Sequence, residues 1–156
     1  MKKYLVIGNP IEHSLSPELH NYWLKNNNIK AIYEKKKLFE DDLGKLILQI
    51  KEKKIDGVNI TIPFKKKIIS HIDELTLEAE STQSVNTIYL KNDKLIGDNT
   101  DIDGFQMSVK KSKFDLTDKK VLILGAGGVV PSIIFALNKM QASKIIVSNR
   151  TKDKAE

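Results

Sequence analysis

The chain contains no cysteine, which excludes disulfides and thiolate metal sites. Long apolar runs are absent too. The first apolar run, from Tyr4 to Ile7, is far shorter than the core of a signal peptide, and no segment approaches the length needed to cross a membrane. We therefore expect a cytoplasmic protein without a membrane partner.

Arginine is also scarce, since Arg150 is the only one among 26 basic residues. The lysines gather in short runs at 35–37, 51–54 and 65–67, with no interleaved aromatic residues and no motif typical of DNA or RNA binding. The net charge of +6 is therefore better explained by a solvated surface than by a nucleic-acid partner. A mild positive field would also help to attract anionic ligands.

The composition, with 40% hydrophobic and 29% charged residues, is that of an ordinary globular protein. Apolar periodicity alternates between strand and helix along the chain, which predicts an α/β fold with mainly parallel sheets. At 156 residues the chain suits one domain, or one domain and part of another. We place a domain boundary near Asp101, between residues 1–101 and 102–156. Strands are predicted at 4–7, 31–36, 57–62, 85–90, 94–97, 121–124 and 144–148, and helices from 16, 43, 66, 74, 102 and 129 onward.

The first predicted helix opens at Ser16-Pro17-Glu18. Serine is a favoured N-cap, proline suits the first helical position, and glutamate complements the positive helix end. We expect this helix to bury Leu19, Tyr22 and Trp23.

A glycine turn follows the apolar strand in "VLILGAGG" and leads into an apolar helix that runs from Val129 to Leu137. Glycines let the backbone turn tightly and approach a pyrophosphate, whose charge then lies at the helix N-terminus. A glycine turn alone is weak support, but here it lies between a strand and a helix and a second strand follows. The third glycine position of the usual fingerprint is Val130, and Pro131 comes next, which departs from the pattern. The predicted cofactor-binding residues in this turn are Gly125, Ala126, Gly127, Gly128 and Val129.

The end of the next strand reads "SNRTK" and has no acidic residue. An NAD site usually places a carboxylate there for the ribose hydroxyls. Arginine and a hydroxyl suit a 2′-phosphate instead, because a guanidinium grips phosphate with two charge-assisted hydrogen bonds. The sequence therefore predicts NADP(H), bound in part by Asn149, Arg150, Thr151 and Lys152.

Polar residues recur two apart in the first hundred residues. In "GNPIEHSLSPELHN", Ser14 and Ser16 would present two hydroxyls to one side of an extended segment, which suits a carboxylate. The alternative is that both serines only cap the helix. Asn59 and Thr61 repeat the spacing in "GVNITIPFK", and Lys65, Asn86 and Asp101 lie at or beyond other strand ends. Polar groups at strand ends converge on the crevice where α/β sheets bind ligands.

Six segments together resemble the shikimate dehydrogenase family: "GNPIEHSLSPELHN", "GVNITIPFK", "SVNT", "GDNTDIDG", "GAGG" and "SNRT", in the family's order and spacing across residues 8 to 151. The resemblance implies reversible, NADPH-dependent reduction of 3-dehydroshikimate to shikimate, in the route to chorismate and aromatic amino acids. It implies a substrate-binding domain followed by the start of a Rossmann-type NADP-binding domain, with the remainder of the second domain beyond Glu156, so that the chain alone is incomplete for catalysis. It assigns the substrate carboxylate to Ser14 and Ser16, the ring hydroxyls to Asn59, Thr61, Asn86 and Asp101, and catalysis to Lys65 with Asp101.

Two other interpretations stay open: a quinate/shikimate relative with looser substrate or cofactor choice, and a non-catalytic ligand-binding fragment. His13 and His20 are expected to be structural, no metal site is predicted, and the protein is expected to be a monomer or a homodimer.

Overall fold

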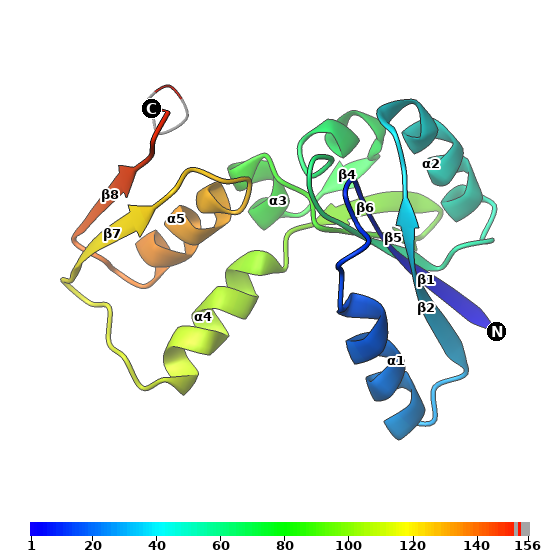
Figure 1. Cartoon of the computed structure of the whole chain (residues 1–156), viewed down its shortest axis with the longest axis horizontal. Coiled ribbons are helices and arrows are strands. Elements are labelled where there is room, and N and C mark those ends of the chain that lie inside the picture. Colours follow the sequence, from blue (N-terminus) through cyan, green and yellow to red (C-terminus); the bar gives the residue numbers. More distant parts are fainter. Residues whose placement is uncertain (152, 154–156) are drawn as a thin grey trace.

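The computed structural model describes residues 1–151 and 153. Its elements form two groups, one built around strands β1–β6 and the other containing α4, α5, β7 and β8 (Figure 1). The strands are β1 (Lys2–Gly8), β2 (Ala31–Lys37), β3 (Gly57–Ile60), β4 (Glu74–Leu75), β5 (Thr87–Lys91), β6 (Lys94–Asp98), β7 (Lys120–Leu124) and β8 (Lys144–Ser148). The helices are α1 (Ser16–Asn26), α2 (Leu43–Lys51), α3 (Leu77–Thr82), α4 (Asp101–Lys111) and α5 (Val130–Lys139), with 3₁₀ turns η1 (Glu40–Asp42) and η2 (Lys67–His71).

The first six strands form one sheet in the order β2-β1-β3-β5-β6-β4. Strand β1 runs parallel to both neighbours, and β4 is parallel to β6, whereas β5 is antiparallel to β3 and to β6. The prediction of a mostly parallel α/β fold is confirmed. The β5–β6 hairpin is also confirmed, and its turn residues Asn92 and Asp93 both have positive φ, as tight hairpin turns require.

The core of the first group lies between this sheet and α2. Leu43, Leu46, Ile47 and Ile50 recur at helical spacing and are all buried, as the sequence predicts. They meet apolar residues of the central strands, among them Ile7, which is fully buried. Because β1 is hydrogen-bonded on both edges and covered by this core, its end is fixed firmly, and the loop that follows it starts from a rigid point.

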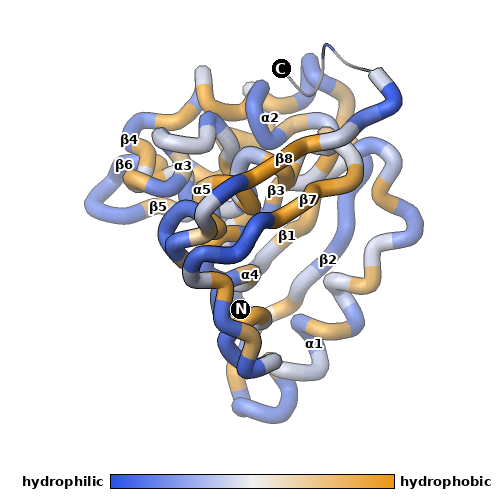
Figure 2. The backbone as a smooth tube through the Cα atoms, turned by 90° about the vertical axis from the view of Figure 1, so that its left-hand side faces the viewer, coloured by the Kyte–Doolittle hydropathy of each residue, from blue (hydrophilic) through white to orange (hydrophobic). Residues whose placement is uncertain are grey.

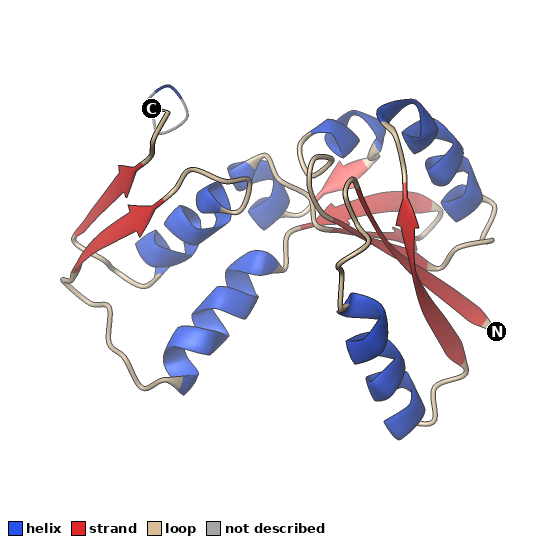
Figure 3. Cartoon of the chain, viewed as in Figure 1, coloured by secondary structure: helices blue, strands red, loops and turns tan. Residues whose placement is uncertain are grey.

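In the second group, β7 and β8 pair in parallel, and α5 connects them. Both strands are apolar, as their orange colour in Figure 2 shows. Helix α5 buries Ala136 and Leu137, and it lies beside α4 (Figure 3). The predicted order of strand, glycine turn, helix and strand is confirmed.

The prediction for α1 is wrong in two respects. The helix begins at Ser16, Leu15 holds the N-cap position, and no side chain caps it. In addition, Leu19, Tyr22 and Trp23 are 48%, 62% and 48% exposed, and α1 buries no residue.

The face that α1 turns toward the sheet is instead formed by His20, Asn21 and Leu24. His20 stacks on Tyr33 of β2, Asn21 exchanges two hydrogen bonds with the Tyr33 backbone, and Leu24 packs in the same small cluster. Two polar residues can face the sheet because both find partners there, and this leaves the bulky apolar residues outside.

A smaller correction concerns the residues after η2. The helix expected at 74–81 begins only at Leu77, since Glu74 and Leu75 form the short strand β4. Thr76 caps α3 by accepting a hydrogen bond from the Ala79 N–H.

Candidate functional site

Lys65 and Asp101, predicted as a pair, lie in contact. The Lys65 Nζ donates to Asp101 Oδ2 at 2.5 Å, and the two side chains are only 16% and 24% exposed. They come from the loop after β3 and from the first residue of α4, 36 positions apart in the chain. A carboxylate in the first turn of a helix also interacts favourably with the helix dipole. The fold therefore gives one partly buried ammonium a fixed direction.

The backbone on both sides of this pair is anchored. The Val85 N–H donates to the Lys65 carbonyl at 2.9 Å, and the neighbouring Phe64 is buried in the core. On the other side, the Asp101 N–H donates to Asn99 Oδ1 at 3.2 Å. Movement of either side chain is thus limited by groups that are themselves packed.

Asn86 connects the pair to the end of the sheet. Its Nδ2 donates to Asp101 Oδ1 at 2.8 Å, while its Oδ1 accepts from the Thr100 N–H and from Thr87 Oγ1. Each oxygen of Asp101 therefore has a donor, one from Lys65 and one from Asn86. Asn86 is positioned to orient Asp101, and its predicted contact with a substrate hydroxyl stays a prediction.

Asn59 is held by partners within the protein. Its Oδ1 accepts from the Tyr33 hydroxyl at 2.6 Å, and its Nδ2 donates to Thr87 Oγ1 at 3.0 Å and to the Asn86 carbonyl at 3.4 Å. Asn59 thus holds Asn86 and Thr87 in place through hydrogen bonds. Its predicted contact with a substrate hydroxyl stays a prediction.

Sequence reasoning missed Tyr33 and Thr87 in this network. Burial raises the pKa of Tyr33 to about 12, so its hydroxyl remains a donor toward Asn59. Burial also lowers the pKa of His20, which stacks on the Tyr33 ring at 4.1 Å. No signal in the sequence marks Tyr33, because a tyrosine in a strand usually only packs against its neighbours.

A hollow of about 300 Å³ lies beside the loop that follows β1. It is lined by Ser14, Ser16 and Thr61, together with Val6, Pro10, Ile11 and His13. The structure brings the two serines together with Thr61, as expected. Neither serine caps α1 in the usual way, although Ser14 Oγ accepts from the Ser16 N–H at 3.3 Å. The alternative in which both serines only cap the helix therefore loses support.

The loop that carries these serines is tied to β2 by lysines. Lys35 Nζ donates to the carbonyls of Glu12 and Ser14, and Lys37 pairs with the Glu12 carboxylate. Hydrogen bonds from the Glu12 backbone, from Lys37 and from the Ile11 backbone lower the pKa of Glu12 to about 2. The lysine run at 35–37 thus has a local structural role.

The glycine turn leaves open space where a pyrophosphate would lie. Gly125 has φ +104°, which side-chain-bearing residues rarely adopt, and its N–H donates to the Ser148 carbonyl at 2.7 Å. At Gly125, Gly127 and Gly128, a Cβ would meet no described atom within 4 Å. Packing among the described residues therefore does not require glycine at 127 and 128, and the space beside them is open to a ligand. The turn fits a dinucleotide, and Ala126 and Val129 lie within it.

Strands β7 and β8 are parallel, so the segments that follow them lie at the same end of the sheet. The glycine turn follows β7, and Asn149, Arg150 and Thr151 follow β8. Arg150 and Thr151 are exposed, and Asn149 Nδ2 donates to the Thr151 carbonyl at 2.7 Å. Lys152, predicted with them, lies outside the described residues. The predicted contact of Arg150 with a ribose phosphate stays a prediction.

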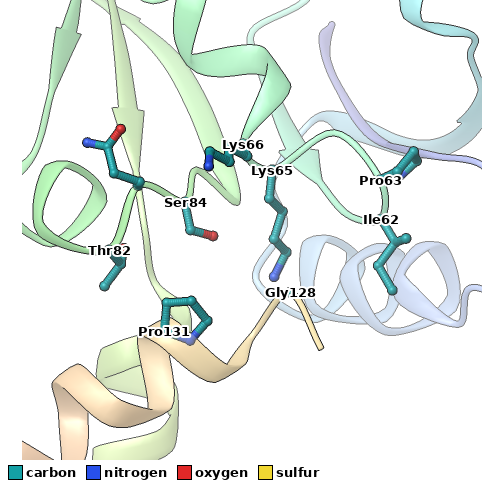
Figure 4. A pocket seen from close by; sticks show the side chains of 9 residues that line it. Ile62, Pro63, Lys65, Lys66, Thr82, Ser84, Gly128 and Pro131 are labelled. Atoms are coloured by element: carbon teal, nitrogen blue, oxygen red, sulfur yellow. The ribbon is translucent and has the colours of Figure 1, made fainter. Parts of the chain in front are cut away.

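A pocket of about 310 Å³ lies between the two groups and brings Lys65 close to the glycine turn (Figure 4). Asn99, a buried residue to which the sequence assigned no role, joins the two groups. Its Nδ2 donates to Thr82 Oγ1 and to Ser132 Oγ, both at 2.8 Å. The pocket is lined by Ile62, Pro63, Lys65, Lys66, Thr82, Gln83, Ser84, Gly128 and Pro131.

Two family models match the chain. The shikimate dehydrogenase substrate binding domain matches residues 6–88, more than half of the chain, and shikimate / quinate 5-dehydrogenase matches residues 108–156. The chain belongs to the shikimate dehydrogenase family.

Individual relatives agree with this assignment. The chain is 59% identical over 154 residues to the shikimate dehydrogenase (NADP(+)) of Pelagibacter ubique, an alignment that covers 99% of this chain and 58% of the relative. The crystal structure of shikimate dehydrogenase from Aquifex aeolicus has a TM-score of 0.92 at 38% identity and covers 99% of this chain and 58% of that one. The Thermus thermophilus enzyme in complex with NADP(H) and shikimate has a TM-score of 0.90 at 32% identity, with the same coverage. The chain thus spans a little over half the length of these relatives.

Within residues 1–151 and 153, no helix is both long and apolar enough for a membrane span, and no three acidic or histidine side chains gather as metal ligands would.

Proposed function

We propose that the full-length gene product with this sequence is an NADP(H)-dependent shikimate dehydrogenase, which reversibly reduces 3-dehydroshikimate to shikimate in the cytoplasm. The observation that carries the proposal is the contact between Lys65 and Asp101 at the edge of a crevice that also reaches Gly128. We further propose that residues 1–101 bind the substrate and that residue 102 begins the cofactor-binding part.

Substrate binding is assigned to hydroxyls, amides and one charge. Ser14 and Ser16 would hold the carboxylate, since they share a hollow with Thr61. Thr61, Asn86 and Asp101 would contact ring hydroxyls. Asn59, whose amide is engaged by Tyr33 and Thr87, would contribute by holding the neighbouring groups in place or by sharing one of its bonds.

Lys65 is assigned the proton step. Reduction of a carbonyl places negative charge on its oxygen, and a nearby ammonium both stabilises this charge and supplies the proton. In the opposite direction the neutral amine takes the proton from the hydroxyl. Asp101 directs Lys65 toward the crevice, because its Oδ2 accepts from Nζ while Asn86 fixes its other oxygen.

The cofactor would be held by the glycine turn and by the residues after β8. NADPH, when bound, supplies the hydride that reduces the carbonyl carbon. The backbone of Gly125, Gly127 and Gly128 would approach the pyrophosphate, and Arg150 would take the 2′-phosphate.

Two alternatives are separated by one set of assays. The full-length gene product is mixed with NADP⁺ or NAD⁺ and with shikimate or quinate, and absorbance of the reduced cofactor is followed. The proposal expects turnover with shikimate and NADP⁺, and much lower kcat/KM with quinate or NAD⁺. Comparable turnover of quinate would favour the quinate/shikimate relative. Ligand binding without turnover would favour the non-catalytic module, against which the Lys65–Asp101 contact speaks.

A further inference from the structure

Ser84 has the one buried side-chain polar atom that finds no hydrogen-bond partner within residues 1–151 and 153. The residue is 4% exposed. Burying a hydroxyl without a partner is unfavourable, and native structures contain few such groups. An unpaired hydroxyl in this position is therefore a candidate for a hydrogen bond with a bound ligand.

The hydroxyl is directed into the pocket between the two groups. Figure 4 shows it pointing into the space between the Lys65 side chain and Pro131. Its backbone is held firmly, because the Ser84 N–H donates to the Ala79 carbonyl and the next residue, Val85, donates to the Lys65 carbonyl. Ser84 therefore directly precedes Val85, whose hydrogen bond holds the backbone of Lys65, the proposed proton donor.

The other polar side chains at the base of α3 are already engaged. Thr82 Oγ1 donates to the Glu78 carbonyl and accepts from Asn99, and Gln83 Nε2 donates to the Glu80 carbonyl. The remaining walls near Ser84 include Ile62, Pro63 and Pro131. The pocket therefore offers apolar sides, the two lysines Lys65 and Lys66, and the unpaired hydroxyl of Ser84.

We propose that Ser84 hydrogen-bonds the carboxamide of the nicotinamide ring of NADP(H) and so orients that ring beside Lys65. A carboxamide carries both a donor and an acceptor, and either of them pairs with a hydroxyl. The pocket volume of about 310 Å³ suits one ring with a substituent and is too small for the whole dinucleotide. This inference rests on the proposed function, since it names a contact of the same cofactor.

The test compares two ligands in the full-length gene product. NADP⁺ carries the nicotinamide, whereas 2′,5′-ADP carries the adenine half and the 2′-phosphate without it. Ser84→Ala is expected to weaken NADP⁺ binding by about threefold to tenfold, the effect of one neutral hydrogen bond, and to leave 2′,5′-ADP binding unchanged. Both dissociation constants are measured by calorimetric titration. Ser70→Ala is the matched control, because Ser70 lies on η2 outside the pocket and its Oγ donates only to the Lys67 carbonyl.

The melting temperature without ligand is the second measurement. Removal of an unpaired buried hydroxyl is expected to leave it unchanged or to raise it. A marked fall, equal losses for both ligands, unchanged NADP⁺ affinity, or a loss confined to shikimate affinity would each overturn the inference. If the wild-type protein binds neither NADP⁺ nor 2′,5′-ADP, the proposed function itself fails. If the wild-type protein binds NADP⁺ and the Ser84→Ala variant binds it equally well, only the proposed contact of Ser84 is wrong.

Discussion

Residues 1–101 and residues 102–151 differ in how their proposed functional residues are held in place. In the first region, several proposed site side chains are held by partners within the protein: Lys65 has Asp101, Asp101 has Asn86, and Asn59 has Tyr33. In the second, the glycines face open space and apolar strand residues such as Leu124 are exposed. Internal hydrogen bonds position side chains of the first site, whereas no described side chain crowds the glycine turn of the second.

Among the variants that leave Lys65 in place, the largest expected effect concerns the internal hydrogen bonds of the first region. Asp101→Asn should lower kcat/KM for shikimate by about a hundredfold, because it removes the charge that directs Lys65 and weakens a substrate contact. Both kcat and KM should worsen in steady-state assays of the full-length gene product. Asp103→Asn, two residues along α4 and exposed, is the control and should leave both values near wild type. A change in KM alone would show that Asp101 does not position Lys65.

The second prediction concerns the open region. Arg150→Ala should reduce the preference for NADPH over NADH by about tenfold to a hundredfold, because a charge-assisted phosphate contact is lost. The ratio of the two dissociation constants is the measurement. Lys144→Ala removes the same charge at the opposite end of β8 and should leave this ratio unchanged. An unchanged ratio in Arg150→Ala would remove the 2′-phosphate assignment.

The third prediction concerns the junction of the two regions. Asn99→Ala should lower the free energy of unfolding by about 1–3 kcal/mol, since Thr82, Ser132 and the Asp101 N–H each lose a buried partner. Urea unfolding measures it, and Asn27→Ala, which removes an exposed amide at the end of α1, is the control. Equal stability of Asn99→Ala and wild type would mean that this network does not link the regions.

The smallest effects are expected at the paired serines. Ser14→Ala and Ser16→Ala should each raise KM for shikimate about threefold to tenfold, the effect of one hydrogen bond, while the melting temperature stays near wild type. Ser112→Ala, which removes an exposed hydroxyl at the end of α4, is the control. A strong fall in melting temperature with normal KM would show that the serines stabilise the loop before α1 and do not bind the carboxylate.

The sequence predicts the fold well where one periodicity dominates. The helical spacing of Leu43, Leu46, Ile47 and Ile50 marks the core face of α2 correctly, because four aliphatic residues on one face of a helix gain from burial together. It fails at α1, where bulky Leu19, Tyr22 and Trp23 look like a core face. The inward face is decided by the hydrogen bonds and stacking of Asn21 and His20 with Tyr33, and such partners exist only once β2 is in place.

The same limit applies to the candidate site. Lys65 and Asp101 are found from the sequence because they lie in segments that resemble a known family, and the structure brings them into contact. Ser84 and Asn99 lie in two of the same segments, "SVNT" and "GDNTDIDG", but the sequence assigns no role to either. The importance of Ser84 depends on its burial without a partner, and that of Asn99 on partners from distant segments, and a short stretch of sequence reveals neither.

The central claim, that Lys65 supplies the proton, is tested most directly by Lys65→Ala in the full-length gene product. Shikimate oxidation by NADP⁺ is followed in the steady state, and shikimate binding is titrated separately. We expect kcat to fall by about 10²–10⁴-fold, because a positioned proton donor and acceptor is lost, while shikimate affinity changes only a few-fold, since its ground-state contacts come from other residues. Lys65→Arg should not restore kcat, because a guanidinium stays protonated and cannot accept the proton. A Lys65→Ala enzyme with near-normal kcat would contradict the account and leave Lys65 as a structural partner of Asp101.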